Sequence, residues 1–430
     1  MSTRIVVVGG GTAGARLAQR LPVTLLGEEP HAPYNRVLLA DVLAGRYAPE
    51  VIALPDAREP VRRGVRVVRI DRAARFVECA DGSTVPYDRL VLATGSNPVL
   101  PPLRGLRGSR LPAGVHPFRT LDDCLELRGL VRPGVRAVVI GGGLLGVSAA
   151  RALAARGAEV MLAQQGERLM ERQLDAQASA LLQEHVESLG VEVHTECRVS
   201  GLRQRDGAVT AVELANGFVL DAQVVVLACG VRPRVGLARE AGLDVRTGVV
   251  VDDELRTSDP YIHAIGDCAE HDGRVYGLAG PALDQADVLA DVLGGGAALA
   301  GTAPQGGEAP ATVPSVVPTR SAPAERLPTT RTAPRYTGTR ALTRLTLSGP
   351  DGLDLAAFGE ATALPGDDVV QLTDATRRAY RKVVVRGDRL VGGVLVGDLA
   401  SVGTLARAWE GDEALPDAPL LHLLTHDGGS

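Results

Sequence analysis

The stretch IVVVGGGTAGARLA at residues 5–18 is a short run of β-branched residues that breaks into spaced glycines and continues into small, helix-favouring residues. The apolar run predicts a buried parallel strand, and Thr12 to Arg20 are expected to form a helix. A second apolar strand, VTLLGEE at 23–29, ends in two acids and completes a β-α-β unit. In that context the glycines predict a dinucleotide site, because backbone N–H groups can approach a pyrophosphate and a carboxylate can accept from a ribose.

The same pattern occurs a second time in the chain. RAVVIGGGLLGVSAARALAARGAEVMLAQQ at 136–165 is again strand, glycine turn, helix and strand. Each copy is followed by a stretch that reads as a β-meander, at 65–92 and 191–228, and by similar strands, LVLATG at 90–95 and VVLACG at 225–230. We interpret this as an internal repeat at the level of the fold.

The repeat predicts an α/β protein with two Rossmann-like three-layer domains, the second inserted in the first, and a small C-terminal α+β domain. The expected boundaries are 1–122 with 250–293 for the first domain, 123–249 for the second, 294–335 for a linker and 336–430 for the C-terminal domain. The linker contains seven prolines and no aromatic residue, so it cannot bury enough surface to offset the cost of ordering. We therefore expect it to be flexible.

Composition excludes several classes of function. The 430 residues carry a net charge of -5, which predicts no nucleic-acid partner and no association with an anionic membrane. No apolar run approaches the roughly 20 residues of a membrane span, so a cytoplasmic protein is expected. The cysteines are far apart and show no metal, cluster or dithiol spacing, so no metal site is predicted. They are Cys79, Cys124, Cys197, Cys229 and Cys268.

A separate signal lies well beyond both glycine turns, in RTSDPYIHAIGDCAE at 256–270. An apolar strand ends there at Gly266 and Asp267, and such a strand end can aim one carboxylate at a polyol hydroxyl. Taken alone, the motif is equally well explained as an ordinary junction between a strand and a turn.

Together, and in this order, these motifs resemble the two-dinucleotide-binding-domain flavoproteins of the pyridine nucleotide-disulfide oxidoreductase-like superfamily, which include ferredoxin, rubredoxin and nitrite reductases. Further segments are similar to the FAD-containing N-terminal part of the assimilatory nitrite reductase large subunit. These segments are 28–47, 114–124, 169–175 and 368–398. The resemblance covers about 1–292 and 336–410.

The resemblance implies FAD in the first domain and NAD(P)H as substrate in the second. Glu28 would bind the adenosine ribose, with Glu29 as the competing candidate, and Asp267 would face the ribityl and pyrophosphate region. The implied FAD residues are Gly9, Gly11, Thr12, Ala13, Gly14, Glu28, Glu29, Arg36, Asp41, Val67, Ala93, Thr94, Gly95, Arg119, Gly266, Asp267 and Ala279. The implied NAD(P) residues are Gly141, Gly143, Leu144, Leu145, Gly146, Ser148, Gln164 and Gly230.

Three positions depart from the pattern of the family. Relatives commonly carry a glutamate where this chain has Ser148, and many carry a partner lysine where it has Asp41, so the sequence predicts that this ion pair is missing at both ends. Gln164 is neither the acid that favours NADH nor an arginine that favours NADPH. The reactive cysteine pair of the disulfide-reductase branch is also absent from the sequence.

The function implied is transfer of hydride from NAD(P)H to FAD and of electrons onward to a partner redox protein, with no catalytic protein side chain required. The expected partner is a nitrite or nitrate reductase component, a ferredoxin or a rubredoxin, and a homodimer is possible. The alternatives are a ferredoxin or rubredoxin reductase of another pathway, and a flavin-binding sensor or partner subunit with a decayed nicotinamide site. A basic cluster, RRAYRK at 377–382, is either a docking site for an acidic electron carrier or a solvated face.

Overall fold

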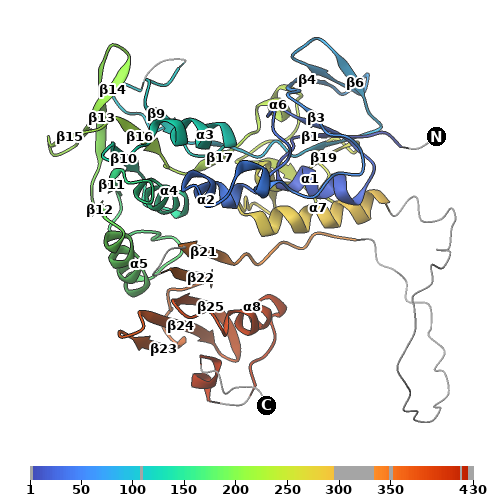
Figure 1. Ribbon diagram of the computed structural model, residues 1–430. Coiled ribbons are helices and arrows are strands. Elements are labelled where there is room, and N and C mark those ends of the chain that lie inside the picture. The colour runs from blue at the N-terminus through green and yellow to red at the C-terminus, as the bar shows by residue number, and fades with distance from the viewer. Residues whose placement is uncertain (1–2, 107–109, 295–333, 348–351, 417–418, 425–430) are drawn as a thin grey trace, which may run out of the picture.

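The computed structural model describes residues 3–106, 110–294, 334–347, 352–416 and 419–424 (Figure 1). Most of the expected linker, residues 295–333, therefore lies outside the described residues. Three five-stranded sheets organise these described residues, two of them parallel and one antiparallel. The predicted fold class is confirmed, whereas the predicted domain boundaries stay predictions.

The first sheet forms around the first glycine turn and has the order β19-β7-β1-β2-β3, with all neighbours parallel. Except for the short edge strand at 62–63, its strands are mostly apolar and buried, as expected for a parallel sheet that is covered on both faces. The strands are β1 (Ile5–Val8), β2 (Thr24–Gly27), β3 (Arg62–Arg63), β7 (Arg89–Leu92) and β19 (Ile262–Ala264). Helices α1 (Thr12–Arg20) and α7 (Ala279–Gly294) run together along one face, and a small antiparallel sheet covers the other (Figure 1). That small sheet is β4 (Val67–Asp71), β5 (Phe76–Cys79) and β6 (Thr84–Pro86).

The second sheet repeats this plan around the second glycine turn, with the order β12-β11-β10-β16-β9 and all neighbours parallel. Its strands are β9 (Val115–Pro117), β10 (Arg136–Ile140), β11 (Glu159–Ala163), β12 (Val191–His194) and β16 (Val224–Leu227). Its helices are α3 (Leu121–Leu130), α4 (Leu144–Ala154) and α5 (Ala176–Ser188). The antiparallel layer is β13 (Val199–Arg205), β14 (Ala208–Leu214) and β15 (Val219–Asp221).

The predicted meanders need a correction at their ends. The strands at 89–92, 191–194 and 224–227 belong to the parallel sheets, and the true antiparallel layers are the three-stranded sheets between them. The runs at 89–92 and 224–227 are apolar at nearly every position, which suits a strand buried on both faces rather than the alternating pattern of a half-exposed meander. The run at 191–194 does alternate, and it forms the edge strand of its parallel sheet.

The two dinucleotide units are joined by a narrow ribbon. Strands β8 (Ser96–Pro98) and β17 (Val231–Pro233) pair antiparallel, so the chain leaves the first unit and returns to it through one two-stranded connection. The remaining short elements are the helices α2 (Leu39–Leu43) and α6 (Gly236–Glu240), the strands β18 (Val249–Val251) and β20 (Ala269–His271), and the 3-10 helices at Arg36–Leu38, Pro49–Ile52, Gly266–Cys268 and Leu420–Leu423.

The C-terminal sheet is antiparallel, with the order β21-β22-β25-β24-β23, and the helix α8 (Val402–Gly411) packs on it. Its strands are β21 (Thr343–Leu347), β22 (Leu353–Gly359), β23 (Asp368–Asp374), β24 (Ala379–Arg386) and β25 (Arg389–Val396). The sequence predicts β21, β24 and β25 but misses β22, β23 and α8.

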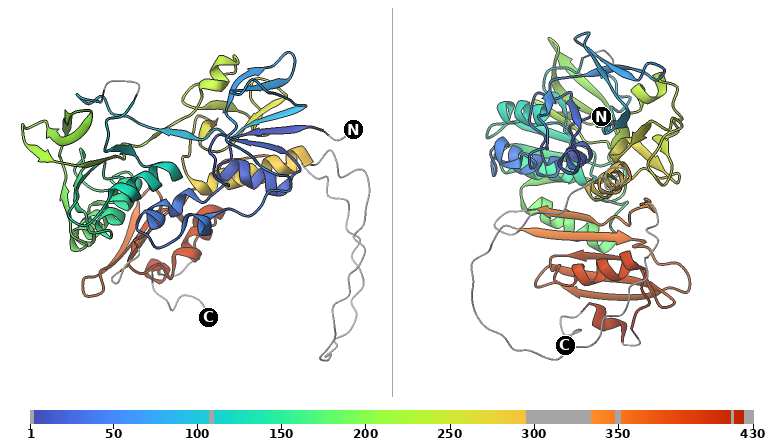
Figure 2. Two further views of the ribbon diagram at one scale, coloured as in Figure 1. Left: turned by 45° about the horizontal axis from the view of Figure 1, so that its top comes forward. Right: turned by 90° about the vertical axis from the view of Figure 1, so that its right-hand side faces the viewer.

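Two views show β21 and β22 on the side of the C-terminal domain that faces the dinucleotide units (Figure 2). Leu345 and Leu355 of these strands share one buried core with Val147 of α4 and Leu182 of α5. Phe358, on the opposite face of β22, packs instead against Trp409 of α8. The alternation of side chains along β22 therefore serves two cores, one within the domain and one between domains.

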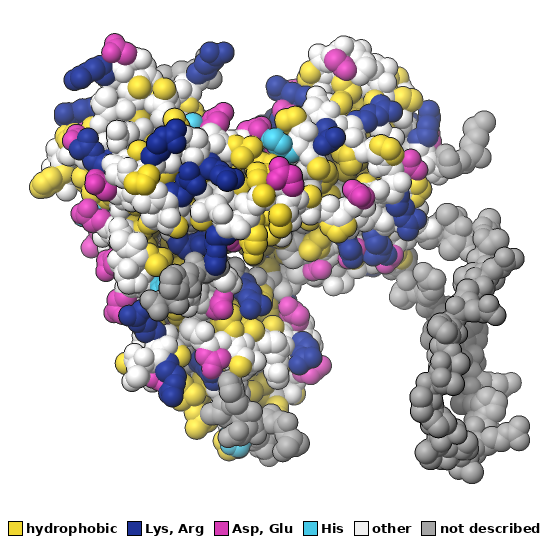
Figure 3. Space-filling model, in the orientation of Figure 1, with side chains coloured by type: hydrophobic (Ala, Val, Ile, Leu, Met, Phe, Trp, Pro, Cys, Tyr) yellow, Lys and Arg dark blue, Asp and Glu magenta, His cyan; other side chains and the backbone are white. Residues whose placement is uncertain are grey.

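Charges of both signs are interspersed over the described residues on the face drawn in Figure 3. No helix within the described ranges has both the length and the apolar character needed to cross a membrane.

Leu355→Ala should destabilise the protein by about 2–5 kcal/mol, because Leu355 is 0% exposed and its loss leaves a cavity in the core between the domains. The measurement is urea unfolding followed by the fluorescence of Trp409, the single tryptophan of the chain. Leu364→Ala is the control, since Leu364 is 53% exposed and should change the free energy of unfolding little. Equal effects of the two substitutions would contradict the assignment of Leu355 to this core.

His263 in β19 should make the fold sensitive to acid. Burial, assisted by the nearby positive charges of Arg89 and Arg256, lowers the pKa of His263 to about 4, whereas an unfolded histidine titrates near about 6.5. As the pH falls, the unfolded chain therefore binds a proton before the folded protein does. The contribution of neutral, buried His263 to the free energy of unfolding is complete above about pH 6.5 and is lost as the pH falls toward 4. His263→Leu should flatten the loss of stability between pH 7 and pH 5 in urea unfolding; an unchanged pH dependence would contradict the assignment.

Candidate dinucleotide-binding site

Both glycine turns have the same construction. The first glycine of each has a positive φ, +118° at Gly9 and +111° at Gly141. It also lies against the end of a neighbouring strand, where a Cβ would approach the carbonyl oxygen of Ala93 to 2.1 Å and that of Ala228 to 2.4 Å. Only glycine can adopt this conformation and allow this approach without a shift of the backbone.

The third glycine of each turn packs against the first. A Cβ on Gly14 would lie 2.0 Å from the carbonyl oxygen of Gly9, and one on Gly146 would lie 1.7 Å from that of Gly141. Each helix is therefore held close to the turn from which it starts. The backbone geometry thus explains why the sequence has glycine at the first and third positions of each turn.

The middle glycines, Gly11 and Gly143, differ from the others. A Cβ on either would meet no described atom within 4 Å, and each glycine is the N-cap of its helix, α1 or α4. Among the described residues no side chain caps either helix start. The N–H groups of the first helical turns therefore face open space at the positive end of the helix, which is the arrangement that binds a phosphate.

The two turns open into one cavity of about 2250 Å³, which is larger than an ordinary ligand pocket of about 300–1,000 Å³. The ends of β2 and β11, the β8–β17 ribbon, α2 and β21 also contribute to its wall. All the residues predicted for FAD and for NAD(P) line this cavity except Gly14 and Gly146, which pack against the first glycine of each turn. The arrangement has room for two extended ligands that meet between the units.

Both candidate acids at the end of β2 line the cavity, but they bond to different partners. Glu28 accepts from Nη1 of Arg234 at 2.5 Å and lies 3.5 Å from Nε of Arg66. The hydrogen bond from Arg234 lowers the pKa of Glu28 against the opposing effect of burial, so its carboxylate is ionised. Glu29 instead accepts from the Tyr34 hydroxyl at 2.6 Å and pairs with Arg36.

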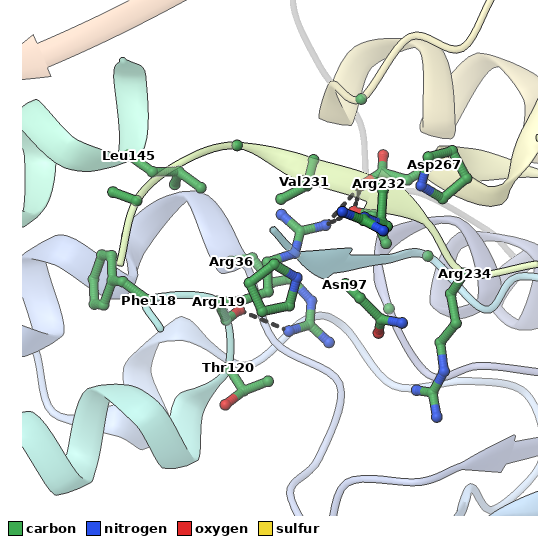
Figure 4. Close-up of a pocket in the computed structure, with 18 of the residues that line it drawn as sticks. Arg36, Asn97, Phe118, Arg119, Thr120, Leu145, Val231, Arg232, Arg234 and Asp267 are labelled. Atoms are coloured by element: carbon green, nitrogen blue, oxygen red, sulfur yellow. Dashed lines mark hydrogen bonds and ion pairs between the residues drawn. The ribbon is translucent and has the colours of Figure 1, made fainter. Parts of the chain in front are cut away.

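The two predicted arginines belong to one polar network. Arg36 donates through Nη1 to the Tyr34 hydroxyl and to the Arg119 carbonyl, both at 3.0 Å. Arg119 donates through Nη2 to Asp267 at 2.6 Å and to the Ser96 hydroxyl at 2.7 Å. Figure 4 shows Arg36, Arg119 and Asp267 at the cavity, with Arg232 and Arg234 from the ribbon and its continuation. Ser96, Arg232 and Arg234 are members of this site that the sequence prediction misses.

The smaller predicted residues lie around the same network. Thr94 donates its hydroxyl to the Arg234 carbonyl at 2.7 Å, and the Gly266 amide donates to Gln285 at 2.7 Å. Gly95 and Gly230 have φ of +71° and +94° and stand at the two ends of the ribbon. Val67 begins β4, and Ala279 begins α7.

At the second turn, two predicted side chains bond to their own unit. Gln164, just past β11, accepts from the Gly142 amide at 2.8 Å and donates to the Arg168 carbonyl at 3.3 Å. Ser148 donates its hydroxyl back to the Leu144 carbonyl at 2.8 Å within α4. Gln164 therefore braces the glycine turn, a role that its position in the sequence does not reveal.

Asp41 has a partner other than the residue at position 148. Asp41 of α2 accepts from Nη2 of Arg151 in α4 at 2.8 Å, so an ion pair does join the two units. Its acid lies in the first unit and its base in the second, and the base is three residues beyond Ser148. The family pattern specifies one position on α4, that of Ser148, and so does not identify Arg151. Residues three apart nevertheless lie on the same face of a helix.

The cysteines do not offer dithiol chemistry. All five are free, and Cys197 and Cys229 line the cavity. Burial raises the pKa of the Cys197 thiol and raises that of Cys229 to about 11, so both are protonated near neutral pH. A reactive cysteine requires the opposite shift.

The profile described as pyridine nucleotide-disulphide oxidoreductase matches residues 3–286, which is more than half of the chain. The chain belongs to this family. A second profile, the rubredoxin NAD+ reductase C-terminal domain, matches residues 344–411 and so covers most of the C-terminal sheet with α8.

Individual relatives agree with the family assignment. The chain is 33% identical over 435 residues to a nitrite reductase [NAD(P)H] large subunit of Klebsiella oxytoca, a match that spans 96% of this chain and 41% of that one. It is 36% identical over 314 residues to rhodocoxin reductase of Rhodococcus erythropolis, across 68% of this chain and 72% of that one. The predicted resemblance is thus confirmed, and the chain spans less than half of the nitrite reductase subunit that it matches.

Solved structures share the fold of the described units. A ferredoxin reductase for the CYP199A2 system from Rhodopseudomonas palustris aligns with a TM-score of 0.80 at 24% identity, over 100% of this chain and 98% of that one. The two dinucleotide units and the C-terminal domain therefore have the arrangement of a known reductase fold.

Gly146→Ala should destabilise the chain by about 1–3 kcal/mol, because the added methyl group would collide with the Gly141 carbonyl. Gly143→Ala is the matched control three residues earlier, where the methyl group has free space. Thermal unfolding of both variants beside the parent chain is the measurement. A Gly146→Ala variant as stable as Gly143→Ala would show that the two backbone segments are not in contact.

Proposed function

We propose that the chain is an FAD-dependent NAD(P)H:acceptor oxidoreductase that passes electrons to a partner redox protein, in nitrite or nitrate assimilation. The observation that carries this proposal is the pair of equivalent glycine turns that open into one cavity. Two dinucleotides bound there by their pyrophosphates would meet between the units, as hydride transfer between two cofactors requires. Family membership supports the same reading.

The residues of the first unit fit FAD. Gly11 leaves the start of α1 open to a pyrophosphate, and Glu28 supplies an ionised carboxylate at the end of β2 for the adenosine ribose. Arg36 and Arg119 would hold the chain of the cofactor beside Asp267. Arg119 donates to the Asp267 carboxylate, and Arg36 donates to the Arg119 carbonyl. The other FAD residues named from the sequence keep the roles implied there, as part of this proposal.

The second unit fits NAD(P)H in the same way. Gly143 leaves the start of α4 open, and Leu144, Leu145 and Ser148 form the cavity side of that helix. FAD, when bound, would supply the redox chemistry by accepting hydride and releasing electrons singly or in pairs. The protein's part is to bind both dinucleotides, to orient them and to exclude water.

The acceptor is proposed from the relatives. The chain aligns with 41% of the matched nitrite reductase subunit, whose name supports nitrite reduction as the process that the electrons serve. The match of the C-terminal domain to a rubredoxin reductase domain favours a second candidate, a reductase for a small electron carrier. A flavin-binding sensor remains the alternative from another class and is separated by the experiment below.

The chain loaded with FAD and mixed anaerobically with NADH or NADPH should lose its flavin absorbance, because hydride reaches the flavin. Rapid bleaching by either nucleotide excludes the sensor. Absence of bleaching by both contradicts the proposed oxidoreductase.

Two aspartate substitutions should separate the two sites. Aspartate is a good N-cap, so Gly11→Asp and Gly143→Asp should keep the helices, while each new carboxylate repels a pyrophosphate. We expect Gly11→Asp to purify without flavin. We expect Gly143→Asp to retain flavin but to bleach at least about tenfold more slowly at low NAD(P)H, since one tenfold step is about 1.4 kcal/mol of lost binding.

Flavin content and circular dichroism check that both variants are folded. Retention of flavin by Gly11→Asp, or loss of flavin from Gly143→Asp, would contradict the assignment of the two turns.

A further inference from the structure

Arg151 is a buried cation on the helix that starts at the second glycine turn. It is 4% exposed, and its neighbours along α4 are small or apolar. A buried charge is costly unless it is paired and hydrogen-bonded. The 2.8 Å hydrogen bond from Nη2 to Asp41 therefore constrains where α4 can lie, because separation of the two groups would remove an acidic partner from a buried charge.

Asp41 belongs to the first unit, and its side chain is 15% exposed. It is on α2, whose residues Val42 and Leu43 are buried in the same apolar core as Val147 of α4. Nη1 of Arg46 lies 3.6 Å from the same carboxylate oxygen. The ion pair thus adds a directional polar contact to the apolar packing between α2 and α4, which belong to different units.

The pair also faces the cavity. Leu144, Ser148 and Arg151 are spaced by four and three residues, so they lie along one face of α4, and all three line the cavity together with Asp41. The N-terminus of α4 is the open glycine turn, and Arg151 is two turns further along the same rigid helix. A change in the contact at Arg151 therefore changes the direction in which the turn holds its ligand.

We propose that Asp41 and Arg151 are a positioning pair, which sets the approach of α4 to α2 and so orients the nicotinamide end of NAD(P)H toward the flavin. This inference rests on the proposed function. The acid of the pair is on the first unit and the base is on the second. The residues at positions 41 and 148 alone do not predict this arrangement. Neither side chain is a catalytic residue, since each acts through the helix that carries it.

The test is anaerobic stopped-flow reduction of the flavin-loaded chain over a range of NADH and NADPH concentrations, with calorimetric titration of NAD+ as a readout separate from activity. Arg151→Met, which keeps the apolar stem, should lower the limiting rate of flavin reduction by about tenfold or more, because small misplacements of reacting groups are costly. The dissociation constant of NAD+ and the flavin content should change by less than about threefold, a split that a general loss of structure would not produce.

Companion variants keep the test informative. Asp41→Asn, the milder change, should slow reduction in the same direction, and the double variant should be no slower than Arg151→Met alone, because both substitutions remove one interaction. Arg151→Lys, which retains the charge, should recover most of the rate. Arg4→Met is the matched control, since Arg4 forms an exposed ion pair with Asp88 on the first unit.

The outcomes are distinguishable. If the parent chain is not bleached by either nucleotide, the proposed function fails. If the parent chain is bleached and Arg151→Met reaches the same limiting rate, the positioning role fails while the proposed function stands. Additive effects in the double variant, or a rise in the NAD+ dissociation constant that matches the loss of rate, would also overturn the positioning role.

Discussion

The close approach of backbone to backbone at the two glycine turns is the constraint on which the rest of the structure depends. Gly9 touches the strand end at Ala93, and Gly141 touches the one at Ala228, at distances that leave no room for a side chain. Each contact seats a helix N-terminus directly over the carboxyl edge of a parallel sheet. The edges then face one another across the β8–β17 ribbon, and one shared cavity is the consequence.

Three arginines of the cavity are held in place by ion pairs. Arg36, Arg119 and Arg234 each have an acidic partner, Glu29, Asp267 and Glu28 respectively. These pairs hold the guanidinium groups in defined places before any ligand arrives, so little side-chain ordering is left for the binding step. A site built in this way favours an extended anionic ligand of one shape over a simple excess of negative charge.

The sequence was sufficient for the parts of the molecule that depend on local patterns. The glycine spacing predicts both turns and the start of α1 at Thr12, and apolar runs predict the parallel strands. It was insufficient where partners are far apart in the chain: the bond of Arg151 to Asp41 spans 110 residues, and that of Arg234 to Glu28 spans 206. The basic cluster at 377–382 shows the same limit, because Arg377, Arg381 and Lys382 are paired with Asp374, Asp398 and Asp175, which weakens its reading as a docking surface.

The narrow ribbon between the units has a mechanical consequence. One strand of it carries Ser96, which bonds to Asp267, and the other leads into Arg234, which bonds to Glu28. A rotation of the nucleotide unit must bend this ribbon, because both crossings of the chain pass through it. Its two strands are therefore tied to two carboxylates of the first site, so the same side chains fix the connection between the units and the wall of the cavity.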